Sequence, residues 1–577
     1  MSVQRAQARQ DIRIHLPNQI ILGAPVGTNL ETFLQSALAE GHLTLSAPLI
    51  AAICDGRLRE LSYVPERDAK VQAVTLSESD GRLIYRRSLV LLLVVAAQEL
   101  FSAKIIVSYA VPDGGLMCEV QGIPPLTSAQ IDALEQHMHN IVQDDNPIIK
   151  QAIALDDAEA LFEARADVDK VRLLQYRTRD TLSLYSLRGY TDYYYGFMVP
   201  STAYLSTFRL IPEGKRFILQ YPRQESPQEL KPMQAYHKLS QAFQQTEDWL
   251  SKMGVEDIGR LNNLTKSERL RELILVAEAL HEQHIANIAA QIAARHAQGL
   301  RVVLIAGPSS SGKTTFSKRL AIQLLAHGLQ PFTLEMDMYF VDRHLTPRDE
   351  HGDFDFESLE AINLALFNEH LARLLEGESV QLPHFDFIEG RSLLGKSVQL
   401  EAKQIIITEG IHGLNPRLIT TLDAHSIYRV YVSALAQINV DNHNRVSTTD
   451  VRLLRRIVRD ARTRGYDANA TLQRWDSVRR GEKRNIFPFQ ENADVMFNSS
   501  LVYELAALRP IAEPLLLRVE PNTPSAIEAR RLLAFLSWVV PMTTNQLSFI
   551  PDTSLLREFV GGSILEGYHP NQPLNHF

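Results

Sequence analysis

The sequence has little of what marks extracellular, membrane-bound or nucleic-acid-binding proteins. Only two cysteines, Cys54 and Cys118, occur among 577 residues, which excludes a disulfide framework and a cysteine-based metal cluster. The formal net charge is -8, so no general basic excess favours nucleic acids, although a local basic patch remains open. The longest apolar run, residues 89–97, is about half of what a membrane-spanning helix needs. Without an apolar leader at the N-terminus, the sequence predicts a cytoplasmic enzyme with no membrane contact.

What is present is the composition of an ordinary globular protein, with 45% hydrophobic and 22% charged residues. At about 150 residues per domain, the length predicts roughly three or four domains. Changes in the hydrophobic pattern divide the chain into five segments: 1–78, 79–223, 224–299, 300–520 and 521–577.

The order of expected strands and helices differs among these segments. The first two mix short strands with helices, which predicts two α+β domains. Residues 224–299 have helical periodicity and predict a helical connector that stops near Gly299. From residue 300, apolar strands alternate with helices, as in a parallel sheet flanked by helices. We therefore predict a multidomain fold with a C-terminal α/β P-loop domain and a helical tail.

The run GPSSSGKTT satisfies the phosphate-binding pattern G-x-x-x-x-G-K-[ST] and stands between an expected strand and an expected helix. In such a loop the backbone amides and the helix N-terminus bind phosphate. Lys313 is expected beside the β- and γ-phosphates and the Thr314 hydroxyl on Mg²⁺. The motif predicts ATP binding, with Mg²⁺ as cofactor, through Gly307, Pro308, Ser309, Ser310, Ser311, Gly312, Lys313, Thr314 and Thr315.

Two carboxylates follow expected strands of this domain, Asp337 in LEMDMYF and Glu409 in IIITEG. Ligands bind at the carboxyl ends of parallel strands. Asp337 could orient an acceptor hydroxyl and take its proton, or could instead support Mg²⁺ indirectly. Glu409 could coordinate Mg²⁺ through water or contact the acceptor. We expect Asp337, Lys313 and Glu409 to act in catalysis, and Thr314 and Glu409 to hold Mg²⁺.

Six short runs resemble the uridine kinase/phosphoribulokinase family of P-loop kinases in their order and spacing: GPSSSGKTT, MDMYF, GDFDFESLEAIN, LPHFDF, TEGI and RRIVRDARTRG. The resemblance implies that Asp337 is the catalytic base. It also implies an arginine lid that closes on the phosphates, formed by Arg455, Arg456, Arg459, Arg462 and Arg464. The spacing of Arg452, Arg455, Arg456 and Arg459 independently places them on one helical face, for which a solvated surface or a nucleic-acid patch is the alternative.

The acceptor region departs from the uridine kinase pattern. The resemblance implies an acceptor site of Tyr339, Glu357, Phe385, Phe387 and Arg474. Glu357 stands where those enzymes have an aspartate, Arg474 falls near a ribose-binding glutamine, and Gly390 near the histidine that reads the pyrimidine. Losing a specific polar contact can change selectivity by orders of magnitude. The acceptor may be a nucleoside, as in the family, or another small polyol or sugar phosphate.

The front half resembles the N-terminal region of threonyl-tRNA synthetase, a TGS domain followed by an editing-type domain. The similar runs are IYRRSLVLLLVVAAQELF, GLMCEV and DYYYGFMVPSTAYLSTFRL. The metal-binding or hydrolytic cluster of that domain is replaced here by Arg87, Leu91, Tyr194 and Met198, which are not a set of metal ligands. We infer that this function has been lost. Residues 193–195 are three tyrosines that could stack on a base or pack in the core.

The leading prediction is an ATP- and Mg²⁺-dependent kinase that phosphorylates a hydroxyl of a nucleoside-like small molecule. A kinase of another polyol or of a sugar phosphate is the close alternative. A different class is an RNA-associated regulator, in which the front domains bind RNA or a nucleotide and the P-loop domain acts as a switch. The front half could also serve only as a structural or homo-oligomerisation platform. The sequence leaves the oligomeric state and the choice between ATP and GTP open.

Overall fold

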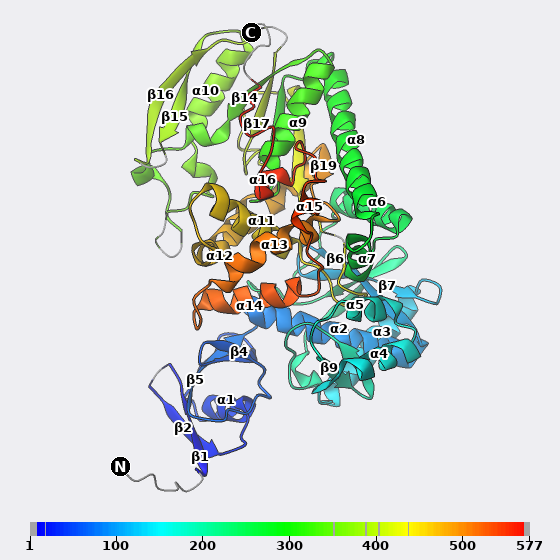
Figure 1. Ribbon diagram of the computed structural model, residues 1–577. Coiled ribbons are helices and arrows are strands. Elements are labelled where there is room, and N and C mark those ends of the chain that lie inside the picture. Colours follow the sequence, from blue (N-terminus) through cyan, green and yellow to red (C-terminus); the bar gives the residue numbers. More distant parts are fainter. Residues whose placement is uncertain are drawn as a thin grey trace.

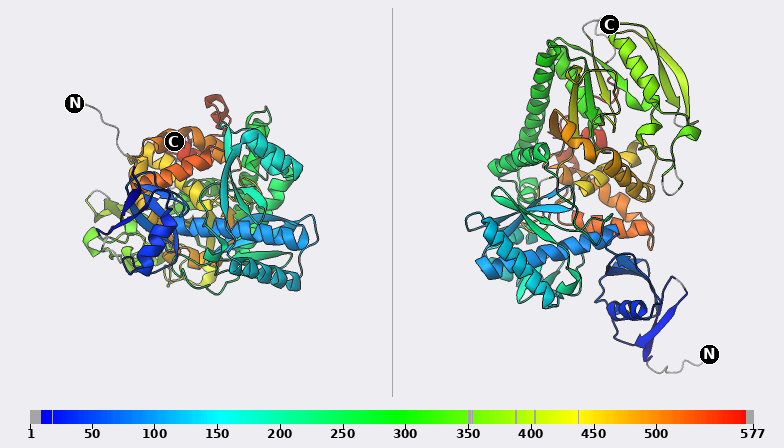
Figure 2. Two further views of the ribbon diagram at one scale, coloured as in Figure 1. Left: turned by 90° about the horizontal axis from the view of Figure 1, so that it is seen from below. Right: turned by 180° about the vertical axis from the view of Figure 1, so that it is seen from behind.

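The computed structural model describes residues 9–17, 19–349, 352, 354–386, 389–401, 404–436 and 438–570. Figure 1 shows an N-terminal domain at one end of the molecule, a second α+β part in the middle and an α/β part at the other end. Figure 2 shows the same order from behind. Within the described residues, no helix has the length and apolar character needed to cross a membrane.

The N-terminal domain is a five-stranded sheet with the order β2-β1-β5-β3-β4, next to one helix. Strand β1 pairs in parallel with β5, and the other neighbours are antiparallel. Alternate side chains of β1 are buried, as expected for a sheet with one covered face. The elements are β1 (Asp11–His15), β2 (Ile21–Pro25), α1 (Leu30–Ala39), β3 (Leu49–Cys54), β4 (Arg57–Arg59) and β5 (Ala69–Thr75).

The middle part is built around one long helix, α2 (Ser79–Phe101), whose apolar run is buried by surrounding protein. A four-stranded sheet with the order β11-β12-β7-β6 and a three-stranded sheet with the order β10-β9-β8 accompany it. The other elements are β6 (Lys104–Val111), β7 (Gly115–Gln121), α3 (Ser128–Gln143), β8 (Ile149–Ala154), α4 (Leu155–Ala164), α5 (Val168–Leu174), β9 (Thr181–Leu187), β10 (Tyr190–Tyr193), β11 (Arg209–Glu213) and β12 (Arg216–Gln220).

The helical connector begins later than the sequence predicts. Residues 224–236 are irregular, and helices follow only as α6 (His237–Met253), α7 (Ile258–Thr265) and α8 (Leu270–His296). Pro232 cannot donate a backbone hydrogen bond and disfavours a helical residue before it. The segment is instead held by side chains, because the Tyr236 hydroxyl donates to Asp113 at 2.6 Å. The prediction of helix from residue 224 was therefore wrong over its first thirteen residues.

The C-terminal part contains a five-stranded sheet with the order β14-β17-β13-β18-β19, and all four pairings are parallel. This confirms the predicted α/β class and adds β19, a strand that the sequence did not indicate. Its strands are β13 (Val302–Ala306), β14 (Gln330–Glu335), β17 (Gln404–Glu409), β18 (Ile427–Ser433) and β19 (Val495–Asn498). Because the strands are parallel, their carboxyl ends lie at one edge of the sheet.

Helices and one hairpin surround this sheet, and a helical tail follows it. The hairpin is β15 (Val380–Asp386) with β16 (Arg391–Val398). The helices are α9 (Lys313–Ala326), α10 (Leu364–Leu375), α11 (Thr448–Thr463), α12 (Ala468–Asn485) and α13 (Glu504–Leu517), and those of the tail are α14 (Pro524–Leu536), α15 (Thr544–Leu547) and α16 (Arg557–Val560).

A buried cluster of charges joins the middle part to the C-terminal part. Lys170 of α5 lies 3.0 Å from Asp192 of β10 and 3.3 Å from Asp441, which follows β18. His443 completes the cluster through a 2.6 Å contact with Asp192. Burial acts to lower the pKa of Lys170, but the two carboxylates outweigh it and raise that pKa. The lysine is therefore charged, and it holds together two parts of the chain that are far apart in sequence.

Removing this lysine is expected to destabilise the protein strongly. Lys170→Met leaves two buried carboxylates without their cation, and breaking such a pair costs about 3–5 kcal/mol of unfolding free energy. Urea unfolding followed by tryptophan fluorescence measures this. Lys252→Met, at an exposed position of α6, is the control and should change stability by less than about 0.5 kcal/mol. Equal stability of the two variants would contradict the role assigned to the cluster.

Candidate functional site

The loop between β13 and α9 has the geometry of a phosphate-binding loop. A side chain at Gly307 would place its Cβ 1.9 Å from the Val432 carbonyl oxygen, so only glycine fits there. Ser310 and Gly312 have positive φ values of 58° and 86°, which aim the loop amides inward. The Lys313 ammonium folds back and donates to the carbonyls of Gly307 at 3.0 Å and Pro308 at 3.2 Å.

Glu409 lies directly in front of this loop. It is the last residue of β17, and the register places it opposite Ile305 of β13 and Glu335 of β14. The Thr314 hydroxyl donates to its Oε1 atom at 2.9 Å, whereas its Oε2 atom is buried without a partner among the described residues. Burial raises the pKa of Glu409 to about 7. The site therefore holds a buried oxygen that can accept a cation.

Asp337 follows β14 and reaches the same edge of the sheet. Its side chain is open to solvent, yet the surrounding protein and nearby Glu335 raise the pKa of its carboxyl while Lys313 acts to lower it. Lys313 acts to lower the pKa of both Asp337 and Glu409, so the three predicted catalytic residues interact electrostatically. Their convergence agrees with the arrangement expected from the sequence.

Glu357 lies against α12 on the other side of the loop. A Cβ at Gly481 would stand 2.5 Å from the Glu357 Cβ, so the glycine permits the close approach. Burial and nearby Glu482 raise the pKa of Glu357 to about 7, although Arg456 and Lys313 act in the opposite direction. Glu357 thus shares the electrostatic environment of the P-loop, and its role in acceptor binding stays a prediction.

Arg455 does not belong to a phosphate-facing lid, which corrects the expectation from the sequence. Its side chain is fully buried and donates to Glu504 at 2.6 Å and to the Ser499 carbonyl at 2.7 Å. Arg452 is also buried, donating to the Ser309 carbonyl at 2.9 Å and to Glu482. Arg452 and Arg455 therefore lie on the buried side of α11, where they donate to backbone carbonyls of the P-loop.

Three of the other lid arginines, Arg456, Arg459 and Arg464, share one carboxylate, whereas Arg462 donates to the Glu558 carbonyl. Asp460 lies 3.3 Å from Arg456, 2.8 Å from Arg459 and 3.7 Å from Arg464. Arg456 also donates to the Ser309 hydroxyl at 2.8 Å, and Arg464 acts on the pKa of Asp337. No sequence pattern singled out Asp460, which holds these three guanidinium groups together.

Tyr339 is the second correction. Only 1% of it is exposed, and its hydroxyl and ring contact His370 and Phe367 within a hydrophobic core. Its position in the chain resembles the family pattern, but its side chain points away from the cleft into that core. Phe385 is likewise 4% exposed, and Phe387 lies outside the described residues.

Phe340 and Phe356, which the sequence did not single out, form an aromatic group with Phe385, and Phe340 lies three residues beyond Asp337 in the chain. The Phe340 ring centroid is 5.6 Å from that of Phe385 and 6.3 Å from that of Phe356. Phe356 is 41% exposed, so this group presents an aromatic face to solvent. The signal was present in GDFDFESLE, whose phenylalanines at positions 354 and 356 carry the group along the loop.

Arg474 is the remaining predicted acceptor residue, and Gly390 is the position of the missing histidine. Arg474 is exposed and its guanidinium lies 4.5 Å from the centre of the Tyr466 ring, on the outer side of α12. Gly390 has a φ of 69°, and a Cβ there would lie 2.7 Å from the Arg343 Nε atom. A base-reading histidine therefore has no room at Gly390, where a guanidinium group stands instead.

Packed side chains occupy the four positions at which the sequence predicts that a metal-binding cluster has been replaced. Leu91, Tyr194 and Met198 are at most 2% exposed and belong to one hydrophobic core. Arg87 donates to the Phe197 carbonyl at 2.6 Å. Of the neighbouring tyrosines, Tyr193 packs against Trp538. The geometry therefore supports core packing for these side chains.

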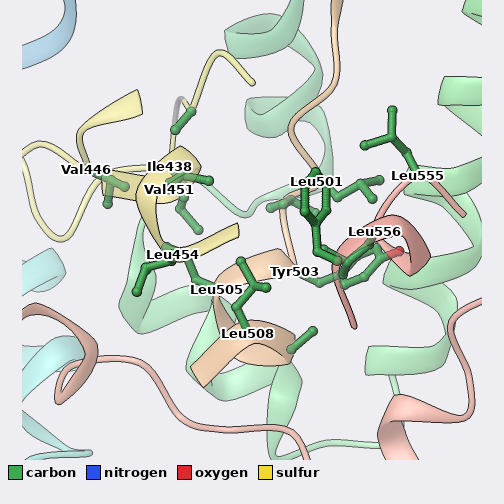
Figure 3. Close-up of a cluster of buried hydrophobic side chains, with 14 of the residues drawn as sticks. Ile438, Val446, Val451, Leu454, Leu501, Tyr503, Leu505, Leu508, Leu555 and Leu556 are labelled. Carbon is green, nitrogen blue, oxygen red and sulfur yellow. The ribbon is translucent and has the colours of Figure 1, made fainter. Parts of the chain in front are cut away.

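The C-terminal tail reaches the P-loop, which no sequence signal indicated. Glu558 of α16 accepts hydrogen bonds from the Thr315 backbone N–H at 3.3 Å and from its hydroxyl at 2.9 Å. Leu555 presses on Gly312, where an added Cβ would stand 2.4 Å from its Cδ2 atom. Figure 3 shows Leu555 and Leu556 beside Tyr503 in the hydrophobic cluster that anchors this tail.

Comparison with known proteins agrees with both resemblances predicted from the sequence. Residues 302–505 match the model of the phosphoribulokinase/uridine kinase family. The N-terminal part is similar to threonine–tRNA ligases. The ligase of Acidithiobacillus ferrooxidans is 32% identical over 167 residues, which make up 29% of this chain and 26% of the ligase. The chain thus spans about a quarter of the length of that relative.

Solved kinase structures are similar to the C-terminal part at low sequence identity. A protein of a Silicibacter species, named as a fructose transport system kinase, is 23% identical with a TM-score of 0.27, covering 37% of this chain and 98% of that protein. The D-glycerate 3-kinase of Cryptococcus neoformans is 15% identical with a TM-score of 0.21, covering 46% and 89%.

The raised pKa of Glu357 predicts a pH-dependent stability difference. A carboxyl whose folded pKa is about 7 instead of 4.5 stabilises the fold at low pH and loses this contribution as the pH rises to about 7. Glu357→Gln should therefore be more stable than the wild type above pH 7, by up to about 3.5 kcal/mol at about 1.4 kcal/mol per pKa unit. Urea unfolding of the ligand-free proteins between pH 5 and pH 8.5 measures this. The exposed control Glu268→Gln should show no such trend; a pH-independent difference for Glu357→Gln would contradict the assignment.

Proposed function

We propose that this protein transfers the γ-phosphate of ATP to a hydroxyl group of a nucleoside-like small molecule, as the match of residues 302–505 to the phosphoribulokinase/uridine kinase family model supports. The observation that carries the proposal is the convergence of Asp337, Glu409 and Lys313 at one edge of the parallel sheet, in front of the P-loop. Phosphoryl transfer depends on positioning and charge neutralisation, and this edge offers both.

Mg²⁺ fits the residues at Thr314 and Glu409. The buried Oε2 atom of Glu409 has no partner among the described residues, and the Thr314 hydroxyl lies beside the other oxygen. No group of three or more acidic, histidine or cysteine side chains in the described ranges could hold a metal alone. This agrees with Mg²⁺, which takes one or two protein ligands together with phosphates and water. Bound there, it would neutralise charge on the phosphates.

The residues can be assigned to a single displacement step. Lys313 and the loop amides hold the β- and γ-phosphates, and Asp337 accepts a hydrogen bond from the acceptor hydroxyl. The hydroxyl oxygen bonds to the γ-phosphorus as the bond to the bridging oxygen of ADP breaks. The hydroxyl proton passes to the Asp337 carboxylate, whose raised pKa favours that transfer. Arg456, Arg459 and Arg464 are placed to leave Asp460 and contact the phosphates.

Two observations bear on the acceptor. The aromatic face of Phe340 and Phe356 suits stacking on a planar base and supports a nucleoside-like molecule. The guanidinium of Arg343 beside Gly390 instead favours an acceptor with a phosphate group, such as a sugar phosphate. We rank the nucleoside-like acceptor first because the aromatic group follows directly on Asp337.

The decisive test is transfer of label from γ-labelled ATP with Mg²⁺ to a panel of nucleosides, polyols and sugar phosphates. Asp337→Asn should lower kcat by about 100-fold or more, because a positioned general base contributes that much. Asp423→Asn is the matched control, since Asp423 is exposed at the opposite end of the strands, ahead of β18. It should leave kcat unchanged.

The panel also decides between the alternatives. Labelled sugar phosphates without labelled nucleosides would favour the second acceptor class. Slow ATP hydrolysis with no labelled product, combined with salt-sensitive RNA binding, would replace the kinase by an RNA-associated regulator. Full activity of Asp337→Asn would overturn its role as the base.

A further inference from the structure

A cavity of about 410 Å³ lies between the middle part and the C-terminal part of the chain. It is lined by α2, the turn after β6, the start of α11, and helices α12 and α14. Figure 1 shows α2 beside α14 at this junction. The volume falls within the range of roughly 300–1,000 Å³ that is typical of small-molecule sites. Neither the P-loop nor Asp337 nor Glu409 lines it, so it is distinct from the phosphate-transfer site.

The cavity wall has more positive than negative charge. Eight basic side chains and four carboxylates line it. Every one of the four carboxylates already has a basic partner in the wall. The pairs are Arg531 with Asp450 and Glu528, Arg223 with Asp113 and Glu225, and Lys483 with Glu225. A further basic residue, Arg452, is bound by Glu482.

Four arginines are left over, Arg82, Arg86, Arg445 and Arg479. Among the residues that the structure describes, no carboxylate lies within ion-pair distance of any of them. Arg445 is only 9% exposed, and the Nε atoms of Arg445 and Arg82 are buried without a hydrogen-bond partner. Burial and Arg479 lower the pKa of Arg82 to about 10, and burial and Arg86 do the same for Arg445. The four guanidinium groups therefore repel one another in a partly dehydrated space.

Such an arrangement is unfavourable unless an anion completes it, because buried charge without a partner destabilises the fold. Guanidinium is the side chain that best matches phosphate, through paired hydrogen bonds. The four come from three separate segments, since Arg82 and Arg86 lie one turn apart on α2, Arg445 precedes α11 and Arg479 lies on α12. Two linked phosphates offer these four groups more acceptor oxygens than a single phosphate does.

We propose that this cavity binds a small molecule that carries at least two linked phosphate groups. A nucleic-acid strand fits less well, because it needs an extended basic face, whereas this site is one cavity in a chain of net charge -8. The same chemistry could come from a nucleoside diphosphate or from inorganic pyrophosphate.

Calorimetric titration of the full-length chain with pyrophosphate and with ADP tests this. All proteins carry Lys313→Ala, which weakens binding at the P-loop and leaves the cavity intact. The double variant Arg82→Gln/Arg86→Gln should weaken pyrophosphate binding at least tenfold. Arg269→Gln, an exposed arginine with its own partner Glu272, is the control and should bind as before. Tighter binding of ADP than of pyrophosphate would identify a nucleotide.

A second measurement separates binding from a structural role. Without ligand, Arg82→Gln should melt at the same or a higher temperature than the wild type, because it removes a repelled buried charge. With pyrophosphate, the wild type should gain more in melting temperature than the variant. The proposal is overturned if pyrophosphate and ADP both fail to bind at millimolar concentration, if only a short RNA binds, or if Arg82→Gln lowers the ligand-free melting temperature.

The tail contact at the P-loop carries a second, independent inference, which rests on the proposed function. The Thr315 N–H belongs to the first turn of α9, where a helix of fourteen residues offers free amides to an anion. The Glu558 carboxylate already accepts that hydrogen bond. Arg462 of the lid helix donates to the Glu558 carbonyl at 2.9 Å, so the lid and the tail are in contact. We propose that Glu558 competes with the phosphates of the nucleotide for the P-loop.

Equilibrium binding of ATP with Mg²⁺ tests the competition. Glu558→Gln removes the charge and should tighten ATP binding about fivefold or more. Glu566→Gln, a neighbouring exposed glutamate of the same tail that lies 3.6 Å from Arg462, should leave it unchanged. Unchanged or weaker binding by Glu558→Gln would overturn this proposal alone. Absence of ATP binding in every protein would instead count against the proposed function.

Discussion

The buried cluster of Lys170, Asp192, Asp441 and His443 is the interaction on which the relation between the two halves depends. All four residues are buried, so water cannot replace a lost partner. Separating the two parts would therefore leave several charges without partners at once. Hydrophobic contact alone is tolerant of small shifts, whereas a lysine between two carboxylates fixes position and orientation.

The part of the chain that is similar to threonine–tRNA ligases also contacts the C-terminal part through other side chains. Leu91, Tyr194 and Met198 lie in its hydrophobic core, and the Tyr195 hydroxyl donates to the Arg445 backbone carbonyl at 3.2 Å. Residues of this part therefore contribute to the contact with the C-terminal part.

How far the sequence could predict this molecule differs between local and distant features. The P-loop, the strand-end position of Asp337 and Glu409, and the α/β class follow from local patterns, because strand, loop and helix are adjacent in the chain. Arg455 and Tyr339 share the spacing of family motifs, but spacing does not tell whether a side chain faces the cleft or the core. Asp460 and Glu558 could not be found, since their roles arise from contacts made only after folding. The start of α6 was misplaced because a helical pattern was read across Pro232.

The backbone of Ser309 in the P-loop is linked by a hydrogen bond to the wall of the cavity. Arg452 donates to the Ser309 carbonyl and Glu482 accepts from the Ser309 N–H at 2.8 Å, while Arg452 also forms part of the cavity wall. A single side chain, that of Arg452, therefore both contacts the P-loop and lines the cavity. Thermodynamic linkage requires that if occupancy of the cavity alters nucleotide affinity, nucleotide alters affinity in the cavity by the same factor. Arg452 would then connect the cavity with the P-loop, so that binding at each site would depend on the occupancy of the other.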